Sequence, residues 1–144
     1  MTRSALILGV LGVLLVTAPA AVARADERTD AIAERLFPPE LIMANQGELG
    51  IDARQREAIV KEVQALQSRV VEIQWQLQGA TEALLKLLDA PRVDEAKALA
   101  QADALMGLER EVKRAHLAAL IRIRNLLTDA QRAKLARLRA APRP

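Results

Sequence analysis

The chain has 144 residues, enough for one domain, and 51 % of them are apolar although its only aromatic residues are Phe37 and Trp75. This shortage of aromatic residues argues against an all-β sandwich, and a charged content of 27 % excludes a protein that crosses a membrane many times. Cysteine is absent, which excludes disulfides, thiol catalysis and thiolate metal sites. Because the chain also has no nucleophile–base pair and no Gly-rich phosphate loop, we expect no enzyme and no cofactor.

The first 25 residues have the order of a secretory signal peptide. Arg3 precedes a continuous apolar run at 5–16, and small residues then supply two overlapping cleavage sites that end at Ala23 and Ala25. We predict cleavage after Ala25 or, as the second choice, after Ala23, with export to the periplasm. The alternative is an uncleaved inner-membrane anchor, because residues 5–23 carry no charge.

Charge is unevenly distributed along the rest of the chain. Residues 26–105 carry 9 basic and 15 acidic side chains, whereas residues 106–144 carry 10 basic and 3 acidic ones. The basic part could meet an acidic surface, a client protein or a lipid headgroup. The alternative is that these charges solvate helices and pair with the acidic part of the fold. The overall balance gives no reason to expect a nucleic acid as partner.

The strongest periodic signal lies between residues 52 and 88. It predicts one long helix over this range with a coiled-coil-like seam, which needs a partner helix to cover it. The apolar residues of the seam alternate spacings of four and three, and they are Ile59, Val63, Leu66, Val70, Ile73, Leu77, Ala80, Leu84 and Leu87.

A turn at 89–92, which contains Pro91, separates this helix from a second long helix predicted at 94–126. The second helix has a broad apolar stripe that suits more than one neighbour, and the short turn makes the two helices an antiparallel hairpin. Shorter helices are predicted at 40–46 and 129–139. The fold class is therefore all-α, a long helical hairpin with short flanking helices.

The same analysis divides the chain into regions. Residues 26–36 are expected to form a flexible polar segment, residues 37–140 the helical domain and residues 141–144 a tail.

Two helix starts share a local pattern. In each, an apolar residue and a capping residue are followed by a glutamine that can reach back to the cap, which makes a capping box. From physics alone these are two good helix starts, and nothing more follows. The residues are Ile51, Asp52 and Gln55 in the first copy, and Leu127, Thr128 and Gln131 in the second.

The sequence Leu-Thr-x-x-Gln at 127–131, before the last helix of an exported and cysteine-free helical chain, resembles the Spy/CpxP family, also called the LTXXQ-motif family. The copy at 51–55 has Asp in place of Thr, and the run Phe-Pro-Pro-Glu-Leu at 37–41 is also similar. The resemblance covers residues 36–139. It implies a periplasmic, four-helix, cradle-like subunit that forms a homodimer and has neither cofactor nor catalysis. Members act as ATP-independent chaperones, as repressors of an envelope-stress sensor kinase, or as periplasmic metal-binding sensors.

The side chains available as metal ligands test whether this chain could be a metal-binding sensor. The mature chain offers His116, Met43 and Met106 and no cysteine. Met106 and His116 are ten positions apart on one predicted helix, about 15 Å in rise, and cannot share an ion within one subunit. We therefore predict no metal site, although a heavy-metal-responsive sensor or a kinase repressor stays an alternative function.

The favoured function is a periplasmic ATP-independent chaperone or envelope-stress accessory protein. Its expected partners are unfolded or misfolded envelope proteins, a second copy of the chain and, as a further candidate, the periplasmic domain of a sensor kinase. Basic residues interleaved with apolar ones suit the holding of clients, because charge attracts at long range and apolar side chains adapt. A purely structural helical dimer is the other alternative. The candidate client-binding face consists of Arg110, Arg114, Arg122 and Arg124.

Trp75 falls on the side of the first long helix that points away from the seam, with Val71 beside it. Burying the indole would remove about 200 Å² from water. We therefore predict that Trp75 and Val71 lie in or beside the homodimer interface. Two alternatives are a singly exposed tryptophan and a position beneath the short helix at 40–46.

Overall fold

A computed structural model describes residues 31–32 and 34–140, so the predicted signal peptide at 1–25 and the tail at 141–144 lie outside the described residues. The described part of the chain is all-helical and has no strand, which confirms the predicted all-α class. None of its helices is both long and apolar enough to cross a membrane. The helices are α2 (Pro39–Ala44), α3 (Gln46–Leu49), α4 (Ala53–Leu88), α5 (Glu95–Leu126) and α6 (Asp129–Ala140).

The two long helices, α4 and α5, begin at acidic caps. The carboxylate of Asp52 accepts a hydrogen bond from the backbone N–H of Gln55 at 2.7 Å, and that of Asp94 accepts one from the N–H of Lys97 at 3.2 Å. Each bond satisfies an N–H that has no partner within the first turn of its helix. The bounds of both helices therefore match the predicted ones closely.

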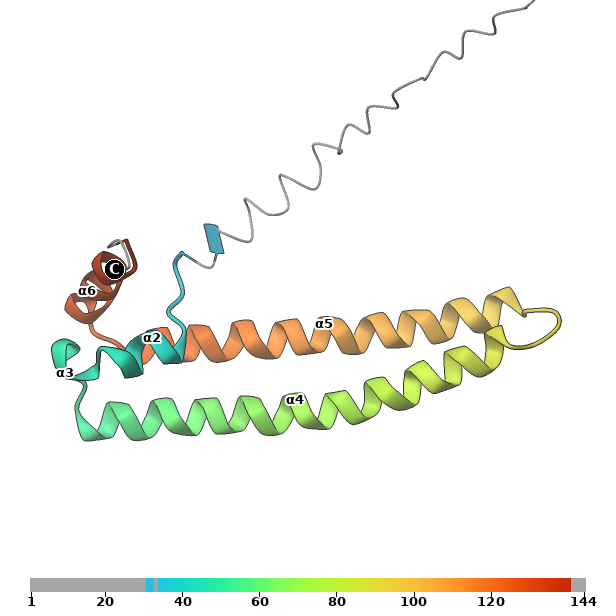
Figure 1. The fold of residues 1–144 in the computed structure, drawn as a ribbon, viewed down its shortest axis with the longest axis horizontal. Helices are drawn as coiled ribbons and strands as arrows, with labels where there is room; N and C mark the ends of the chain where they lie inside the picture. Colours follow the sequence, from blue (N-terminus) through green and yellow to red (C-terminus); the bar gives the residue numbers. More distant parts are fainter. Residues whose placement is uncertain (1–30, 33, 141–144) are drawn as a thin grey trace, which may run out of the picture.

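Helices α4 and α5 lie side by side along their length and are joined by a short turn (Figure 1). Cross-helix bonds place the beginning of one beside the end of the other. Arg122 donates to Glu62 at 2.6 Å near one end, and Gln101 donates to the carbonyl of Ala80 at 3.0 Å near the other. The two helices therefore run in opposite directions. Every residue of the predicted seam of α4 is buried or half-buried, which confirms the seam.

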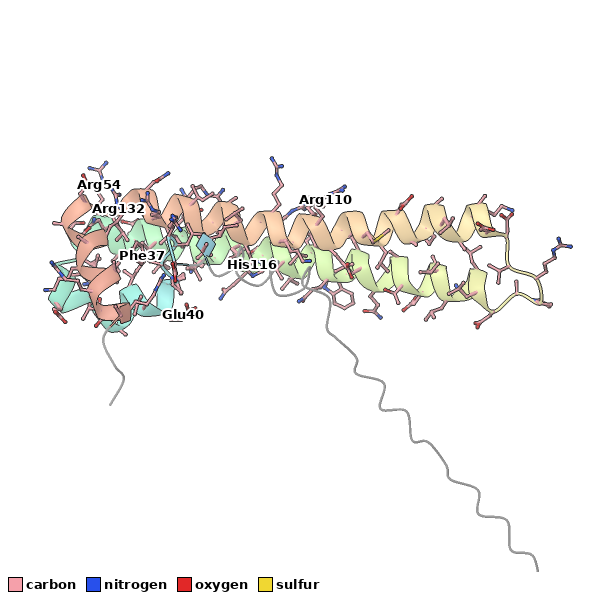
Figure 2. The ribbon with its side chains drawn as sticks, turned by 90° about the horizontal axis from the view of Figure 1, so that it is seen from above. Phe37, Glu40, Arg54, Arg110, His116 and Arg132 are labelled. Carbon is pink, nitrogen blue, oxygen red and sulfur yellow. The ribbon has the colours of Figure 1, made fainter. Side chains whose placement is uncertain are left out.

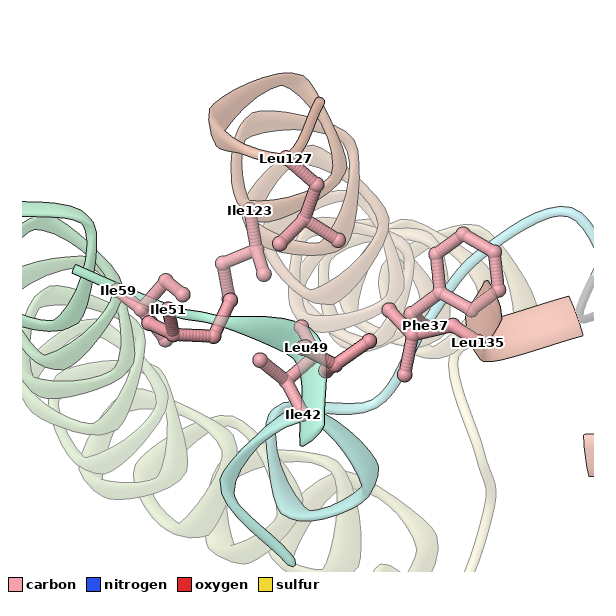
Figure 3. Packing of buried hydrophobic residues seen from close by; sticks show 8 residues of the cluster. All are labelled: Phe37, Ile42, Leu49, Ile51, Ile59, Ile123, Leu127 and Leu135. Carbon is pink, nitrogen blue, oxygen red and sulfur yellow. The ribbon is translucent and has the colours of Figure 1, made fainter. Parts of the chain in front are cut away.

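The buried core is concentrated at one end of the molecule, where α2, α3 and α6 meet the start of α4 and the end of α5 (Figure 1). We call residues 36–63 and 119–140 the head, and residues 64–118 the arm. In the arm, only Ile73 and Ala98 are buried. Figure 3 shows the core cluster of the head, which consists of Phe37, Ile42, Leu49, Ile51, Ile59, Ile123, Leu127 and Leu135.

The head differs from the sequence prediction in one element. Instead of one short helix over 40–46 followed by a turn, the chain forms α2 and then a separate helix, α3. The chain turns between them at Asn45, whose side-chain amide donates to the carbonyl of Leu41 at 2.7 Å. Helix α3 ends at Gly50, whose φ of 65° is left-handed and favours glycine. The extra turn carries Leu49 into the core.

The end of the segment predicted to be flexible, 26–36, is attached to the head. Leu36 is only 8 % exposed, and the carbonyls of Arg35 and Leu36 accept hydrogen bonds from Arg124 and Arg139 respectively. The guanidinium of Arg139 also lies 5.1 Å from the ring centroid of Phe37, within cation–π range. Arginines of α5 and α6 thus fix the point where the chain enters the domain.

Candidate functional site

The two capping boxes meet in the head and form one hydrogen-bond network, although their glutamines are 76 positions apart in the chain. The amide of Gln55 donates to the oxygen of Gln131 at 2.9 Å, and the amide of Gln131 donates back at 3.1 Å. The second N–H of Gln55 reaches the carbonyl of Leu126 at 2.8 Å, and that of Gln131 reaches the carbonyl of Leu49 at 3.4 Å. This glutamine pair links α3, α4, α5 and α6.

Each oxygen of the glutamine pair also serves its own capping box. It accepts the backbone N–H of the capping residue, Asp52 at 3.3 Å or Thr128 at 2.9 Å. Each primary amide therefore uses both N–H donors and two acceptor positions, the full capacity of the group. Gln131 is only 8 % exposed, and full satisfaction removes the penalty of burying it. The glutamine pair is a structural element of the head, a role beyond two separate helix starts.

Exposed side chains of α5 form a second stripe, separate from the residues that face α4. The positions again alternate spacings of four and three, with one extra step of four, so they follow one face of the helix. Most are exposed, and they mix apolar with mainly basic residues. We call this set the outer stripe of α5: Leu99, Asp103, Met106, Arg110, Lys113, Leu117, Ile121 and Arg124.

The broad apolar stripe predicted for this helix is thus two stripes, one covered by α4 and one outward. Figure 2 shows Arg110 on the arm, away from the head where Phe37 and Arg132 lie. Arg110 and Leu117 border a shallow depression of about 520 Å³. Its other lining residues are Gly107, Glu111, Lys113 and Arg114.

The structure separates the four arginines of the candidate client-binding face. Arg110 and Arg114 are exposed and lie together at the depression on the outer stripe of α5. Arg122 instead forms an ion pair with Glu62 of α4 at 2.6 Å, and Arg124 donates to the carbonyl of Arg35 at 3.2 Å. Lys113, another basic residue of the same helix, joins the first pair. Its spacing from Arg110 places both side chains on one face of the helix.

A second set of exposed side chains follows α4, about 100° round the helix from the seam that packs on α5. Its spacings are four and three throughout, and every member is exposed and uncharged. The sequence itself contains this pattern, one position after each residue of the predicted seam. We call this set the outer seam of α4: Val60, Gln64, Gln67, Val71, Gln74, Gln78, Thr81, Leu85 and Leu88.

Trp75 flanks the outer seam of α4 and is 72 % exposed, while Val71 is 52 % exposed. The alternative that placed Trp75 beneath the short helix at 40–46 is therefore wrong, because the arm carries it beyond the reach of α2. Trp75, Val71, Gln74 and Gln78 border a shallow depression of about 310 Å³. An exposed indole beside exposed aliphatic side chains is a surface available to a partner.

Charged side chains of the arm form hydrogen bonds and ion pairs at two places, around Arg69 and around Asp94. Hydrogen bonds to Glu72 and Glu111 raise the pKa of Arg69 above its ordinary value. The backbone N–H and the ammonium of Lys97 lower the pKa of Asp94. Both arrangements hold surface charges in place, and neither resembles an acid–base pair for catalysis.

The candidate metal donors are scattered. His116 is exposed, and its Nδ1 lies 3.0 Å from the carbonyl oxygen of Val112. Met43 lies on α2 in the head, whereas Met106 lies on the outer stripe of α5. Within residues 31–32 and 34–140, no three His, Cys, Asp or Glu side chains come together as a metal site.

Comparison with known proteins finds no match to this chain among family models, curated proteins or solved structures. The resemblance to the Spy/CpxP family therefore stays a prediction from the motifs at 51–55 and 127–131.

Proposed function

We propose that this chain is a periplasmic ATP-independent chaperone or envelope-stress accessory protein, which holds unfolded clients on the outer stripe of α5. The observation that carries the proposal is the exposure of Leu99, Met106, Leu117 and Ile121 along the same helix face as Arg110 and Lys113. An isolated soluble helix pair would ordinarily present charged and polar residues at such positions.

The composition of this stripe suits transient binding of many sequences. Cationic side chains attract acidic, unfolded segments over about 8 to 10 Å at ordinary salt concentrations. Short-range contacts then come from flexible Met and Leu side chains, which repack against different clients. The depression beside Arg110 is shallow and open to solvent, so a client can leave without ATP-driven opening of the protein.

The finer architecture belongs to the same proposal. The two long helices form an antiparallel hairpin, the short helices of the head complete a cradle-like four-helix subunit, and the functional unit is a homodimer. Opposed α4 and α5 and the exposed faces of the arm support this assignment. The capped motifs at 51–55 and 127–131 support it through the family resemblance.

An aggregation assay tests the proposed function. The purified mature chain, without nucleotide, is expected to suppress light scattering by an unrelated unfolding protein at equimolar or lower ratio. The double variant Met106→Ser/Leu117→Ser removes apolar contact from the outer stripe of α5 and should lose most of this suppression. Because both side chains are exposed, helicity by circular dichroism should persist.

The matched control is Val93→Ser, which removes an exposed valine from the turn at the tip of the arm. It should suppress aggregation as the unmodified chain does. Equal suppression by all three proteins would show that the outer stripe of α5 does not hold clients. No suppression by the unmodified chain would favour the purely structural dimer.

A further inference from the structure

Three basic side chains at the depression on α5 have no acidic partner. Arg110, Lys113 and Arg114 are exposed, and none of them forms an ion pair or a side-chain hydrogen bond within residues 31–32 and 34–140. The one acidic residue that borders the depression, Glu111, is already hydrogen-bonded to Arg69 of α4. Like charges three and four positions apart on a helix repel one another. The depression therefore favours an anionic occupant.

The residues that precede the head carry the opposite charge. Residues 26–34, at the start of the predicted mature chain, contain four acidic side chains and one basic one. The acidic residues are Asp26, Glu27, Asp30 and Glu34. The first three lie outside the described residues, whereas Glu34 is exposed and forms no ion pair in the part of the chain that the structure describes. This segment and the depression on α5 are therefore complementary in charge.

The structure fixes the point at which this acidic segment leaves the head. Nε of Arg124 donates to the carbonyl of Arg35 at 3.2 Å, and Arg124 is itself the last member of the outer stripe of α5. Before this point the chain is outside the core, since Ile32 is 54 % exposed. Residues 31–32 lie near the end of α5, on the side away from α4 (Figure 1). The acidic segment therefore begins at one end of the outer stripe of α5.

The distances allow the acidic segment to reach the depression. Lys113 is 11 positions before Arg124, which is about 16 Å along α5. An extended chain covers about 3.3 Å per residue, so the five residues from Arg35 back to Asp30 span about 16 Å, and the whole segment spans about 30 Å. Lys97, near the tip of the arm, is 27 positions before Arg124 and about 40 Å away. The segment can therefore cover the half of α5 nearest the head and no more.

We propose that residues 26–34 are a tethered competitor for the client surface: their carboxylates bind Arg110, Lys113 and Arg114, and a client must displace them. The inference rests on the proposed function, because it describes the regulation of the same surface. Exposed ion pairs are individually weak, which lets a client displace the segment without ATP. Between clients, the segment covers cations and apolar side chains that would otherwise face water.

The tether favours this occupant over a separate molecule. Attachment at Arg35 holds the acidic segment near the depression at an effective concentration on the order of 1 mM. A free anion or an acidic stretch of another protein could use the same cations, but it would have to reach that concentration in solution. The same surface of a second copy would bring like charges together.

Carbodiimide crosslinking, which joins a carboxylate to a nearby lysine amine as an amide, tests the contact on the mature chain without any client. Mass spectrometry should find Lys113 joined to Asp30 or Glu27. In a mixture of unlabelled and isotope-labelled chains, the joined peptides should carry the same label, as expected for a link within one chain. Lys97 is the matched control, because it is exposed on the same helix but out of reach. No link at Lys113, equal linkage of the segment to Lys97, or mixed-label pairs as frequent as same-label pairs overturns the inference.

A second measurement tests the competition. A fluorescently labelled peptide of residues 26–34 is titrated with the mature chain and with a variant whose own segment has lost three acidic charges. If the segment covers the stripe half to four-fifths of the time, the variant should bind the peptide about two- to five-fold more tightly, because a larger fraction of the chain is open. The variant is Glu27→Gln/Asp30→Asn/Glu34→Gln.

The control variant makes the same change in net charge at exposed glutamates elsewhere, and it should bind the peptide as the unmodified chain does. It is Glu57→Gln/Glu82→Gln/Glu95→Gln. No gain in affinity by the segment variant, or an equal gain by the control, also overturns the inference. Neither measurement uses an unfolded client, so the aggregation assay decides the proposed function separately.

Discussion

The head and the arm are built from the same two long helices but bury very different amounts of their side chains. In the head, three short helices close over α4 and α5, and eight apolar residues form one core cluster with the glutamine pair beside it. In the arm, α4 and α5 have only each other, and large residues such as Trp75 and Met106 stay exposed. A pair of helices can cover one stripe on each partner, and any further apolar stripe faces water. The head therefore supplies stability, and the arm supplies surface.

The largest loss of stability is expected from a cavity made in the core of the head. Ile123→Ala removes a completely buried side chain from the core cluster and should lower the free energy of unfolding by about 2 to 5 kcal/mol. The matched arm variant, Leu84→Ala, alters a half-buried seam residue and should cost about 1 to 2 kcal/mol. Urea unfolding followed by circular dichroism gives both values. Equal losses would show that stability is spread evenly over head and arm.

Substituting a buried glutamine of the head and a glutamine of the arm compares the two regions through their hydrogen bonds. Gln131→Glu replaces two N–H donors by a carboxylate facing the oxygen of Gln55 and the carbonyl of Leu49, and should cost about 3 kcal/mol. Its control in the arm is Gln101→Glu, which loses one bond to the carbonyl of Ala80 and should cost about 1 kcal/mol.

The Gln131→Glu variant should also depend on pH. Burial and the facing oxygens raise the pKa of the introduced carboxyl in the folded state. Relative to the unmodified chain, the variant is therefore most stable below the pKa of the unfolded chain, about 4.3, and loses stability as pH rises through the higher folded value. The difference between the urea midpoints of the variant and of the unmodified chain provides the measurement, and a difference that does not change with pH would contradict the buried position of this side chain.

The smallest effect is expected at the tip of the arm. The folded-state pKa of Asp94 lies below its ordinary value of 3.8, chiefly because the carboxylate accepts the N–H of Lys97. Its stabilising contribution is present above pH 3.8 and is lost as pH falls through the lower folded value. The protection factors of the amides in the first turn of α5, which correct for the intrinsic pH dependence of hydrogen exchange, should therefore fall in acid. In Asp94→Asn, which keeps a capping side chain, that fall should disappear.

The sequence was sufficient for the helices that carry strong local signals. The seam from Ile59 to Leu87 has an unbroken period, and Asp52, Asp94 and Pro91 mark the helix boundaries, so α4 and α5 follow from local physics. Helix α3 was missed because two glycines, Gly47 and Gly50, favour a turn there. Its helical turn is stabilised by burying Leu49 among residues distant in the chain.

The sites were harder to predict because they depend on which helices meet. Gln55 and Gln131 each read as a local cap, and only the three-dimensional packing of α4 on α5 brings them together. Likewise, Arg122 and Arg110 look alike in the sequence, but Arg122 faces Glu62 across the helix pair. The outer seam of α4 was readable in principle, since its spacing and lack of charge are properties of the sequence alone.

The attachment of Arg139 to Leu36 and Phe37 places the beginning and the end of the domain side by side. A pulling force applied between these two points acts on the head, because the connection between them closes there. Contacts of the head would yield one after another, while the arm, which lies beyond this closure, bears no load until the head opens. The head, which has the dense core, therefore bears the pulling force, and the exposed helices of the arm carry no tension.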